Sequence, residues 1–359
     1  MSPNRRLNDF LKALEGKIGR ANALRELVEC CKVAGRYPGT LQFDNTVPGW
    51  SALFCGLLTF GLMAIVFYAD GQYLAPIAKV LHLHLRDAQF AAVVLSVLLA
   101  GTGIGCLGVM ASRNHQVYEL ADAISFKAAL AHNGLTSDQS PREMTLDRLS
   151  QSFGDYARGN YSREIRAAYT GHFARDGIRL DFSYYQLHYV NRRVEVSTDS
   201  KGKTTTRTVY DHYDRYSLVI PFKWVREVSL RSDSQDVIDR DFEYRTNHPH
   251  FESQFHLSAS SQLKAAKFAK PTVVLILDEL GRSLNRVNLE FDANGLLCIS
   301  FSDSDLLDYE KPAASLLQPA ELAQAISEDM AMPKLRALLG RVQSLSNATD
   351  NNFAQPQSA

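Results

Sequence analysis

Two long apolar runs stand out against an otherwise mixed pattern of hydrophobic and polar positions. The first covers residues 50–68 without a charged residue, and the second covers residues 90–111. A helix rises about 1.5 Å per residue, so each run is long enough to cross the roughly 30 Å hydrocarbon core of a bilayer. The pattern therefore predicts a transmembrane hairpin over residues 50–111, joined by a loop over residues 69–89.

Basic residues are unevenly distributed around the predicted spans. The segment before residue 50 contains eight Lys and Arg residues, whereas the loop contains only Lys79 and Arg86. Because Lys and Arg near span ends are retained on the cytoplasmic side, we predict that both termini are cytoplasmic. The rest of the chain has 29 basic and 32 acidic residues and no long basic stripe, which argues against a nucleic-acid partner.

The segment 1–49 has apolar residues at three- and four-residue steps, which predicts two short amphipathic helices broken near Gly16 and Gly19. These helices could pack on the protein's own cytoplasmic domain or lie in the lipid headgroup layer, and Cys30 and Cys31 could carry acyl chains. The five cysteines are scattered, so they predict neither a disulfide framework nor a C-x-x-C metal pair.

Beyond the second run, residues 112–160 predict a helical stalk followed by a polar linker. Residues 161–345 form the predicted cytoplasmic α+β domain, in which a mixed or antiparallel sheet is packed with helices. Alternating apolar residues between Ile178 and Phe222 predict strands. The hydrophilic segment 197–203 between them predicts a long hairpin that reaches beyond the core.

The last third of the chain has clearer boundaries, because proline and Asn-Gly signals separate its apolar segments. The expected elements are a strand over 251–257, helices over 258–269 and 271–284, a hairpin of strands 289–291 and 296–301, helices that begin at Pro319 and after Pro333, and a disordered polar tail over 346–359.

Glycines are concentrated in the second apolar run, where residues 103–108 spell G-x-G-x-x-G. A dinucleotide site would need a strand before this motif and a helix that begins at it, and a bilayer-length helix provides neither. Small residues also let helices approach closely. We therefore predict a helix-packing face, within one chain or between subunits, formed by Gly101, Gly105 and Gly108 of the second run and by Gly56 and Gly61 of the first.

The segment 210–216 combines carboxylates, an imidazole and phenols, which could supply general acid and base groups. On a strand, alternate residues point to opposite faces, so His212 and Asp214 are the pair that could act together. A solvated, hydrogen-bonded strand face is the competing interpretation, and it is the one we favour.

Three segments are weak candidates for metal ligation. His248 and His250 could offer two imidazoles, but no third ligand is defined. His82 and His84 diverge on a helix because they are two residues apart. Residues 303–308 begin like a calcium loop but lack its sixth-position glycine and closing glutamate. We therefore predict no metal site and no cofactor, and we lean against an enzyme.

A family resemblance rests on the order of elements between residues 251 and 308. Phe-x-Ser-x-Phe is followed by Ala-Ala-Lys-Phe-Ala-Lys-Pro at 265–271, a helix, the Asn-Leu-Glu-Phe strand, an Asn-Gly turn, a strand and Asp-Leu-Leu at 305–307. This order resembles the bacterial membrane family called domain of unknown function 3137, whose members are often encoded near LemA-type proteins. The resemblance implies two N-terminal spans and a cytoplasmic α+β domain, with departures at 184–216 and after Pro319.

These observations predict a multi-pass protein of the bacterial inner membrane that anchors a cytoplasmic protein-interaction domain. Its expected partners are the lipid bilayer, a second copy of itself and other membrane proteins. The first alternative is an oligomeric pore or membrane effector gated by the cytoplasmic domain, although the runs contain few polar side chains. A membrane-tethered hydrolase that uses His212 with Asp214, or His248 with His250, is the second alternative.

Overall fold

The computed structural model describes residues 2–68, 75–80, 84–175, 177–198, 204–232 and 240–350. The chain divides into two compact units, one formed by residues 1–128 with 311–328 and the other by 129–310 with 329–359. Residues 129–160 thus belong to the second unit, and residues 311–328 belong to the first. Three predicted regions lie wholly or partly outside the described residues: the loop 69–89, including His82, the hairpin tip 199–203 and the tail from residue 351.

The first unit begins with two amphipathic helices, α1 (Pro3–Arg20) and α2 (Leu24–Gly35), which α10 (Pro319–Ala325) joins by packing on α2. Both predicted helices are confirmed, but the break lies at residues 21–23 rather than at Gly16 and Gly19. Lys127 donates hydrogen bonds to the carbonyls of Ile18, Gly19 and Ala21, at 2.7, 2.8 and 3.0 Å. These bonds satisfy carbonyls that the end of α1 leaves free, which fixes where the helix ends.

The apolar faces of α1 and α2 are buried within this unit. Their buried residues are Leu7, Leu11, Leu14, Ile18, Leu27, Cys30, Cys31 and Ala34. Burial raises the pKa of the Cys31 thiol to about 12 and also raises that of Cys30, so neither side chain presents a reactive thiolate. The placement of these helices against protein is supported, and acylation of the two cysteines is not.

Two helices of the first unit are long and apolar enough to cross a membrane: α3 (Thr46–Tyr68) and α5 (Leu85–His132), with the short helix α4 (Ala75–Val80) between them in sequence. The candidate spans are residues 46–67 and 86–132. Most of their large side chains are exposed, including Trp50, Phe54, Phe60, Phe90, Leu98 and Ile104. The predicted helical continuation beyond residue 111 is confirmed, because α5 runs unbroken to His132.

The second unit is built on a nine-stranded sheet with the order β1-β2-β3-β4-β9-β8-β5-β7-β6, and every pairing is antiparallel. The prediction of a mixed or antiparallel sheet thus resolves to the antiparallel form. The strands are β1 (Leu135–Ser137), β2 (Ser162–Arg175), β3 (Ile178–Thr198), β4 (Thr204–Pro221), β5 (Val228–Arg231), β6 (Phe242–Tyr244), β7 (His256–Ala259), β8 (Asn288–Phe291) and β9 (Leu296–Phe301).

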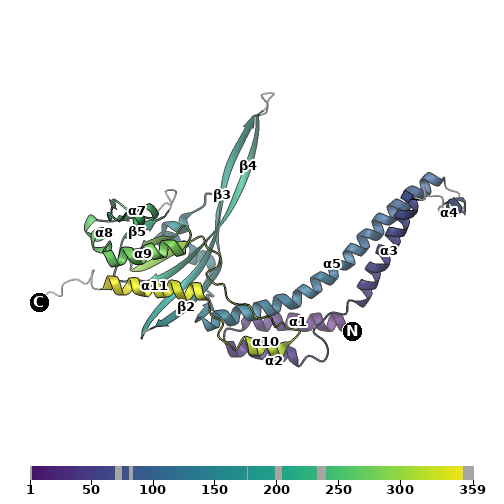
Figure 1. The fold of residues 1–359 in the computed structure, drawn as a ribbon, viewed down its shortest axis with the longest axis horizontal. Helices are drawn as coiled ribbons and strands as arrows, with labels where there is room; N and C mark the ends of the chain where they lie inside the picture. Colours follow the sequence, from purple (N-terminus) through teal and green to yellow (C-terminus); the bar gives the residue numbers. More distant parts are fainter. Residues whose placement is uncertain are drawn as a thin grey trace. The chain divides into compact units, whose positions relative to one another are not determined.

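Helices complete the core of this unit. The segment α6 (Arg142–Ser152) with the short 3-10 helix η2 (Gly154–Ala157) packs Leu149, Phe153 and Tyr156 against Tyr185 and Leu187 of β3. The helices α9 (Pro271–Ser283) and α11 (Pro333–Asp350) pack side by side (Figure 1). The region predicted as a polar linker therefore contains β1, α6 and η2, and the predicted tail is helical as far as Asp350.

Two boundaries in the last third differ from the prediction. Phe251 lies in α7 (Pro249–Gln254), where His248 caps the first turn by accepting a hydrogen bond from the Phe251 N–H at 3.2 Å. The helix α8 (Gln262–Phe268) starts after Ser261, whose hydroxyl accepts from the Lys264 N–H. Such caps satisfy the free N–H groups of a first turn. At α7 the cap overrides the alternating pattern that suggested a strand, and at α8 it places the start of the predicted helix later. The predicted 271–284 helix, the β8–β9 hairpin and the helices at Pro319 and Pro333 are confirmed.

The strands β3 and β4 extend beyond the rest of the sheet (Figure 1). Their neighbours end early, because β2 pairs with β3 only as far as Val190 and β9 pairs with β4 only from Tyr216. The segments 191–198 and 204–213 therefore form a two-stranded extension, called the ribbon below. Its existence confirms the prediction of a long hairpin.

Candidate functional site

His212 and Asp214 lie on the same face of β4, as alternation predicts, and His188 of β3 links them. The Nδ1 atom of His188 lies 3.1 Å from Oδ1 of Asp214, and its Nε2 atom lies 3.2 Å from Nδ1 of His212. The two imidazole rings are stacked with their centroids 5.4 Å apart. His188 is buried and His212 is exposed, so this row of three hydrogen-bonded side chains ends at the protein surface with His212.

The direction of these hydrogen bonds follows from the carboxylate, which can only accept. Nδ1 of His188 must therefore donate to Asp214, and Nε2 of a neutral His188 accepts from Nδ1–H of His212. This arrangement leaves the lone pair of His212 Nε2 at the surface. Gln186 and Arg166 orient the carboxylate, with their nitrogen atoms 3.3 and 3.7 Å from Oδ1 of Asp214. Such a chain can hold an imidazole in one tautomer, as a general base requires.

Local sequence pattern does not single out His188, but the pairing of β3 with β4 does. The β3–β4 register pairs His188 with Asp214 and Val190 with His212, so a correct strand alignment would have brought the three side chains together. Within the residues that the structure describes, no group of three or more His, Cys, Asp or Glu side chains could hold a metal ion.

His248 and His250 do not form a pair. His248 caps α7, whereas Nδ1 of His250 bonds to Oδ1 of Asp278 in α9. Arg282 donates to the other oxygen of Asp278 at 2.6 Å, and these two partners hold the pKa of the Asp278 carboxyl below its ordinary value. The two imidazoles therefore connect parts of the fold separately and do not converge on a shared ligand.

The five predicted packing glycines do not contact the neighbouring apolar helix. A Cβ atom added at Gly56, Gly61, Gly101, Gly105 or Gly108 would meet nothing within 4 Å. The contact with α3 is made at Gly103, where an added Cβ would lie 3.5 Å from Cβ of Cys55. Ser96 of α5 is fully buried, and its carbonyl accepts a hydrogen bond from the Thr59 hydroxyl of α3 at 3.4 Å.

A cluster of buried charges connects η2 to the sheet. Arg215 of β4 donates to Asp155 at 3.1 Å, and Arg158 donates to the other oxygen of the same carboxylate. Glu290 of β8 accepts the backbone N–H groups of Gly154 and Asp155 at 2.7 and 3.0 Å. Burial, reinforced by the nearby Asp155 charge, raises the pKa of Glu290 to about 7. These contacts anchor η2 on the sheet, and the sequence pattern gives no sign of them.

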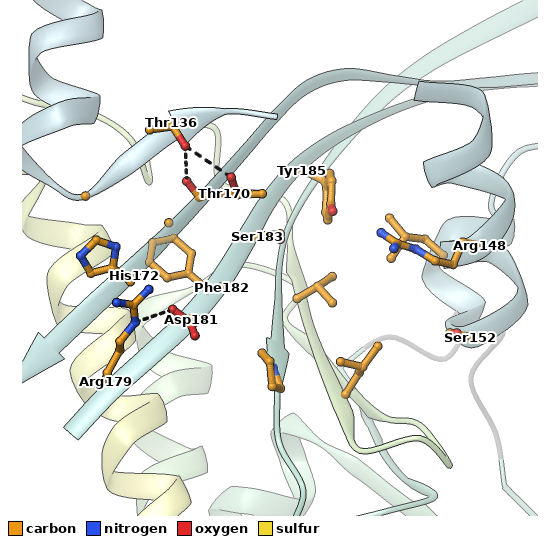
Figure 2. Close-up of a pocket in the computed structure, with 16 residues that line it drawn as sticks. Thr136, Arg148, Ser152, Thr170, His172, Arg179, Asp181, Phe182, Ser183 and Tyr185 are labelled. Carbon is orange, nitrogen blue, oxygen red and sulfur yellow. Dashed lines mark hydrogen bonds and ion pairs between the residues drawn. The ribbon is translucent and has the colours of Figure 1, made fainter. Parts of the chain in front are cut away.

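A cleft of about 560 Å³ opens beside α6 on the sheet face formed by β1, β2, β3, β4 and β9. Figure 2 shows Arg148 on one side, His172 and Arg179 on the other, and Ser183 and Tyr185 between them. Arg179 donates to Asp181 at 2.8 Å. None of these residues was a sequence candidate, because they come from separate strands and share no motif.

No family model, curated protein or solved structure matches this chain. The resemblance to domain of unknown function 3137 accordingly stays a prediction, and the site must be interpreted from its own geometry.

Proposed function

We propose that this protein is a membrane-anchored assembly module whose α3 and α5 helices cross the bilayer and whose ribbon joins it to a second copy of the same chain. The anchor is supported by the exposure of these helices, because only 6% of the most apolar 18-residue stretch of α3 and 17% of that of α5 are buried. The core helix of a water-soluble protein would bury its apolar residues, whereas a membrane helix exposes them to lipid.

The distribution of Lys and Arg supports a location in the inner membrane with both termini on the cytoplasmic side, so the sheet unit would lie in the cytoplasm. Fractionation and alkaline extraction test the anchor. The intact protein is expected to stay with membranes at high pH, and release into the supernatant would contradict membrane crossing.

The observation that carries the assembly proposal is the open outer edge of β4. Between Thr204 and Tyr213 this edge has no strand neighbour among the described residues, because β9 pairs only from Tyr216 onward. Alternation directs the backbone groups of even-numbered residues outward, in line with the 2.7 Å bond from the Phe222 N–H to the Gly295 carbonyl. An open edge of this length is a template for an added strand.

The sequence of this edge is complementary to itself. In an antiparallel pair of β4 strands related by a two-fold axis at Val209, Arg207 of each copy lies opposite Asp211 of the other. Thr208 then lies opposite Tyr210, where outward backbone groups can form a hydrogen-bonded pair. Asp211 already accepts from Arg193 at 2.6 Å, whereas no ion pair of Arg207 is found among the described residues. A second copy would provide Arg207 with a carboxylate.

Cysteine crosslinking tests this register. Val209→Cys would place two thiols directly opposite each other in a non-hydrogen-bonded pair, where Cβ atoms lie close enough for a disulfide. Oxidation of native membranes is expected to give a covalent dimer. The matched control is Val194→Cys, an exposed position on the β3 strand of the same ribbon, 60% accessible. Equal yields from the two variants would contradict assembly through the β4 edge.

The charge pattern gives a second test of the same interface. Arg207→Glu places two like-charge pairs across the two-fold axis, and each opposed pair costs about 0.2 to 1 kcal/mol. We expect the crosslinking yield of Val209→Cys to fall several-fold when this change is added. An unchanged yield would mean that the strands meet in another register.

Acid–base catalysis is a second candidate function, favoured by the hydrogen-bonded chain from Asp214 through His188 to His212. The chain would leave Nε2 of His212 able to take a proton from a substrate. If it acts as a base, His212→Gln and His188→Gln should abolish a cellular phenotype that depends on this protein, while Val209→Cys under reducing conditions should not. Full complementation by both glutamine variants would remove this candidate.

A further inference from the structure

We propose that the cleft beside α6 binds a small amphipathic organic anion, with its acidic group at Arg148 and its apolar part over Val219 and Leu296. The cleft residues do not belong to the ribbon, so ligand binding here does not depend on the assembly proposed above.

The cleft exists because α6 covers only part of its face of the sheet. Leu149 of α6 packs on Tyr185 and Leu187, which are buried, and so fills the space above that end of β3. Ser183 and Asp181, which lie closer to the start of β3, point to the same face, and they are partly and fully exposed, respectively. The end of α6 thus forms a wall, and the uncovered strands form a floor.

The charges of the lining residues favour an anion. Within the described ranges, the Arg148 guanidinium has no hydrogen-bond or ion-pair partner. Hydrogen bonds from Ser140 outweigh burial and lower the pKa of nearby Asp138, and the charges of Arg142 and Arg148 add smaller contributions. Arg179 is matched by Asp181, and the His172 side chain adds hydrogen-bonding capacity beside that pair. Among the residues that line the cleft, two arginines and one aspartate leave a net positive charge, and an arginine can bind a carboxylate or phosphate through two parallel hydrogen bonds.

The floor explains why the anion should carry an organic part. Thr136, Thr170 and Ser183 lie in register across β1, β2 and β3, and Val219 continues the same row on β4. Leu296 and Pro221 add apolar surface beside them. A volume of about 560 Å³ falls in the range of small-molecule sites, which combine an apolar lining with a few polar groups. A free inorganic ion would leave most of this surface unoccupied.

Calorimetry with a defined probe tests the inference. Phenyl phosphate, which carries an aromatic ring and a dianionic head, is titrated into the full-length protein in lipid nanodiscs. We expect saturable binding at one site per chain, and at least tenfold weaker binding of both inorganic phosphate and benzyl alcohol. Equal binding of inorganic phosphate would show that only the charge is recognised, and absence of any saturable heat at millimolar phenyl phosphate would overturn the site.

Two variants and one control assign the binding to the cleft. Arg148→Gln removes the unpaired cation and is expected to weaken phenyl phosphate binding at least tenfold, while Ser183→Phe fills the floor and should abolish it. Lys267→Gln removes an exposed cation of α8 outside the cleft and should leave the affinity unchanged. Each variant is first shown to unfold at the same temperature as the wild-type protein. Wild-type affinity in both cleft variants, or an equal loss in Lys267→Gln, would overturn the proposal.

Discussion

The buried carboxyl of Glu290 gives a quantitative prediction, because its environment opposes ionisation. Only 3% of this residue is exposed, and burial with the nearby Asp155 charge raises its pKa from 4.5 to about 7. A carboxyl whose pKa is raised in the folded state contributes stability that is present below the unfolded pKa and is lost as pH rises through the folded pKa. The native fold should therefore become less stable between about pH 4.5 and pH 7.

The size of the effect follows from the shift. One pKa unit corresponds to about 1.4 kcal/mol, so the full shift corresponds to about 3 kcal/mol, and most of it falls between pH 5 and pH 8. Glu290→Gln keeps a carbonyl that can accept from the Gly154 or Asp155 N–H group, but it cannot ionise. We expect this variant to match the wild-type stability within about 1 kcal/mol at pH 5 and to exceed it by about 2 kcal/mol at pH 8.

The assay can be confined to the sheet unit, since the chain has two tryptophans, Trp50 in α3 and Trp224 in the sheet unit. In a Trp50→Phe background, urea unfolding of the detergent-solubilised protein is followed by Trp224 fluorescence at several values between pH 5 and pH 8. Other ionisable groups are common to both proteins, so the difference between them isolates Glu290. A difference that stays constant across this range would refute the reasoning.

Two further substitutions test packing and charge. Gly103→Val should separate α5 from α3 at Cys55 and lower the free energy of unfolding by about 1 to 3 kcal/mol, whereas Gly101→Val should lower it far less. Thermal unfolding of the purified protein distinguishes the two variants. Equal losses would contradict the packing at Gly103. Arg215→Met should cost about 3 to 5 kcal/mol in the urea assay, because it leaves the buried Asp155 charge with one arginine fewer, and a loss below 1 kcal/mol would mean that this pair is not needed.

Much of the fold could be predicted from local patterns. The apolar runs, the proline-initiated helices and the Asn-Gly hairpin each depend on neighbouring residues, and each is present. The helix at Phe251 was missed because the His248 cap decides it, and a single imidazole is a weaker signal than alternating apolar residues. Strand order and domain composition depend on distant contacts, so the return of residues 311–328 to the N-terminal unit was not predictable.

Candidate residues on β4 show the same limit. Alternation alone placed His212 and Asp214 on one face, and that prediction is confirmed by their shared contact with His188. The missing residue lies on another strand, and its position depends on the register of the β3–β4 hairpin. A shift of one residue would move every side chain of β3 to the opposite face. The chemistry of the site is therefore a consequence of register, which local propensity does not determine.

The position of each glycine around the α5 axis determines whether it faces α3. Each residue advances about 100° around a helix, so Gly101, Gly105 and Gly108 fall within about 60° of one another, whereas Gly103 lies on the opposite side. Gly103 shares its side with Ala92 and Ser96, and all three are buried. A G-x-x-x-G motif indicates where a helix backbone can be approached closely, but the buried row of small residues determines which side α3 occupies. The glycine content thus identified the correct helix, but the residues in contact with α3 depend on the angular position of each residue around α5.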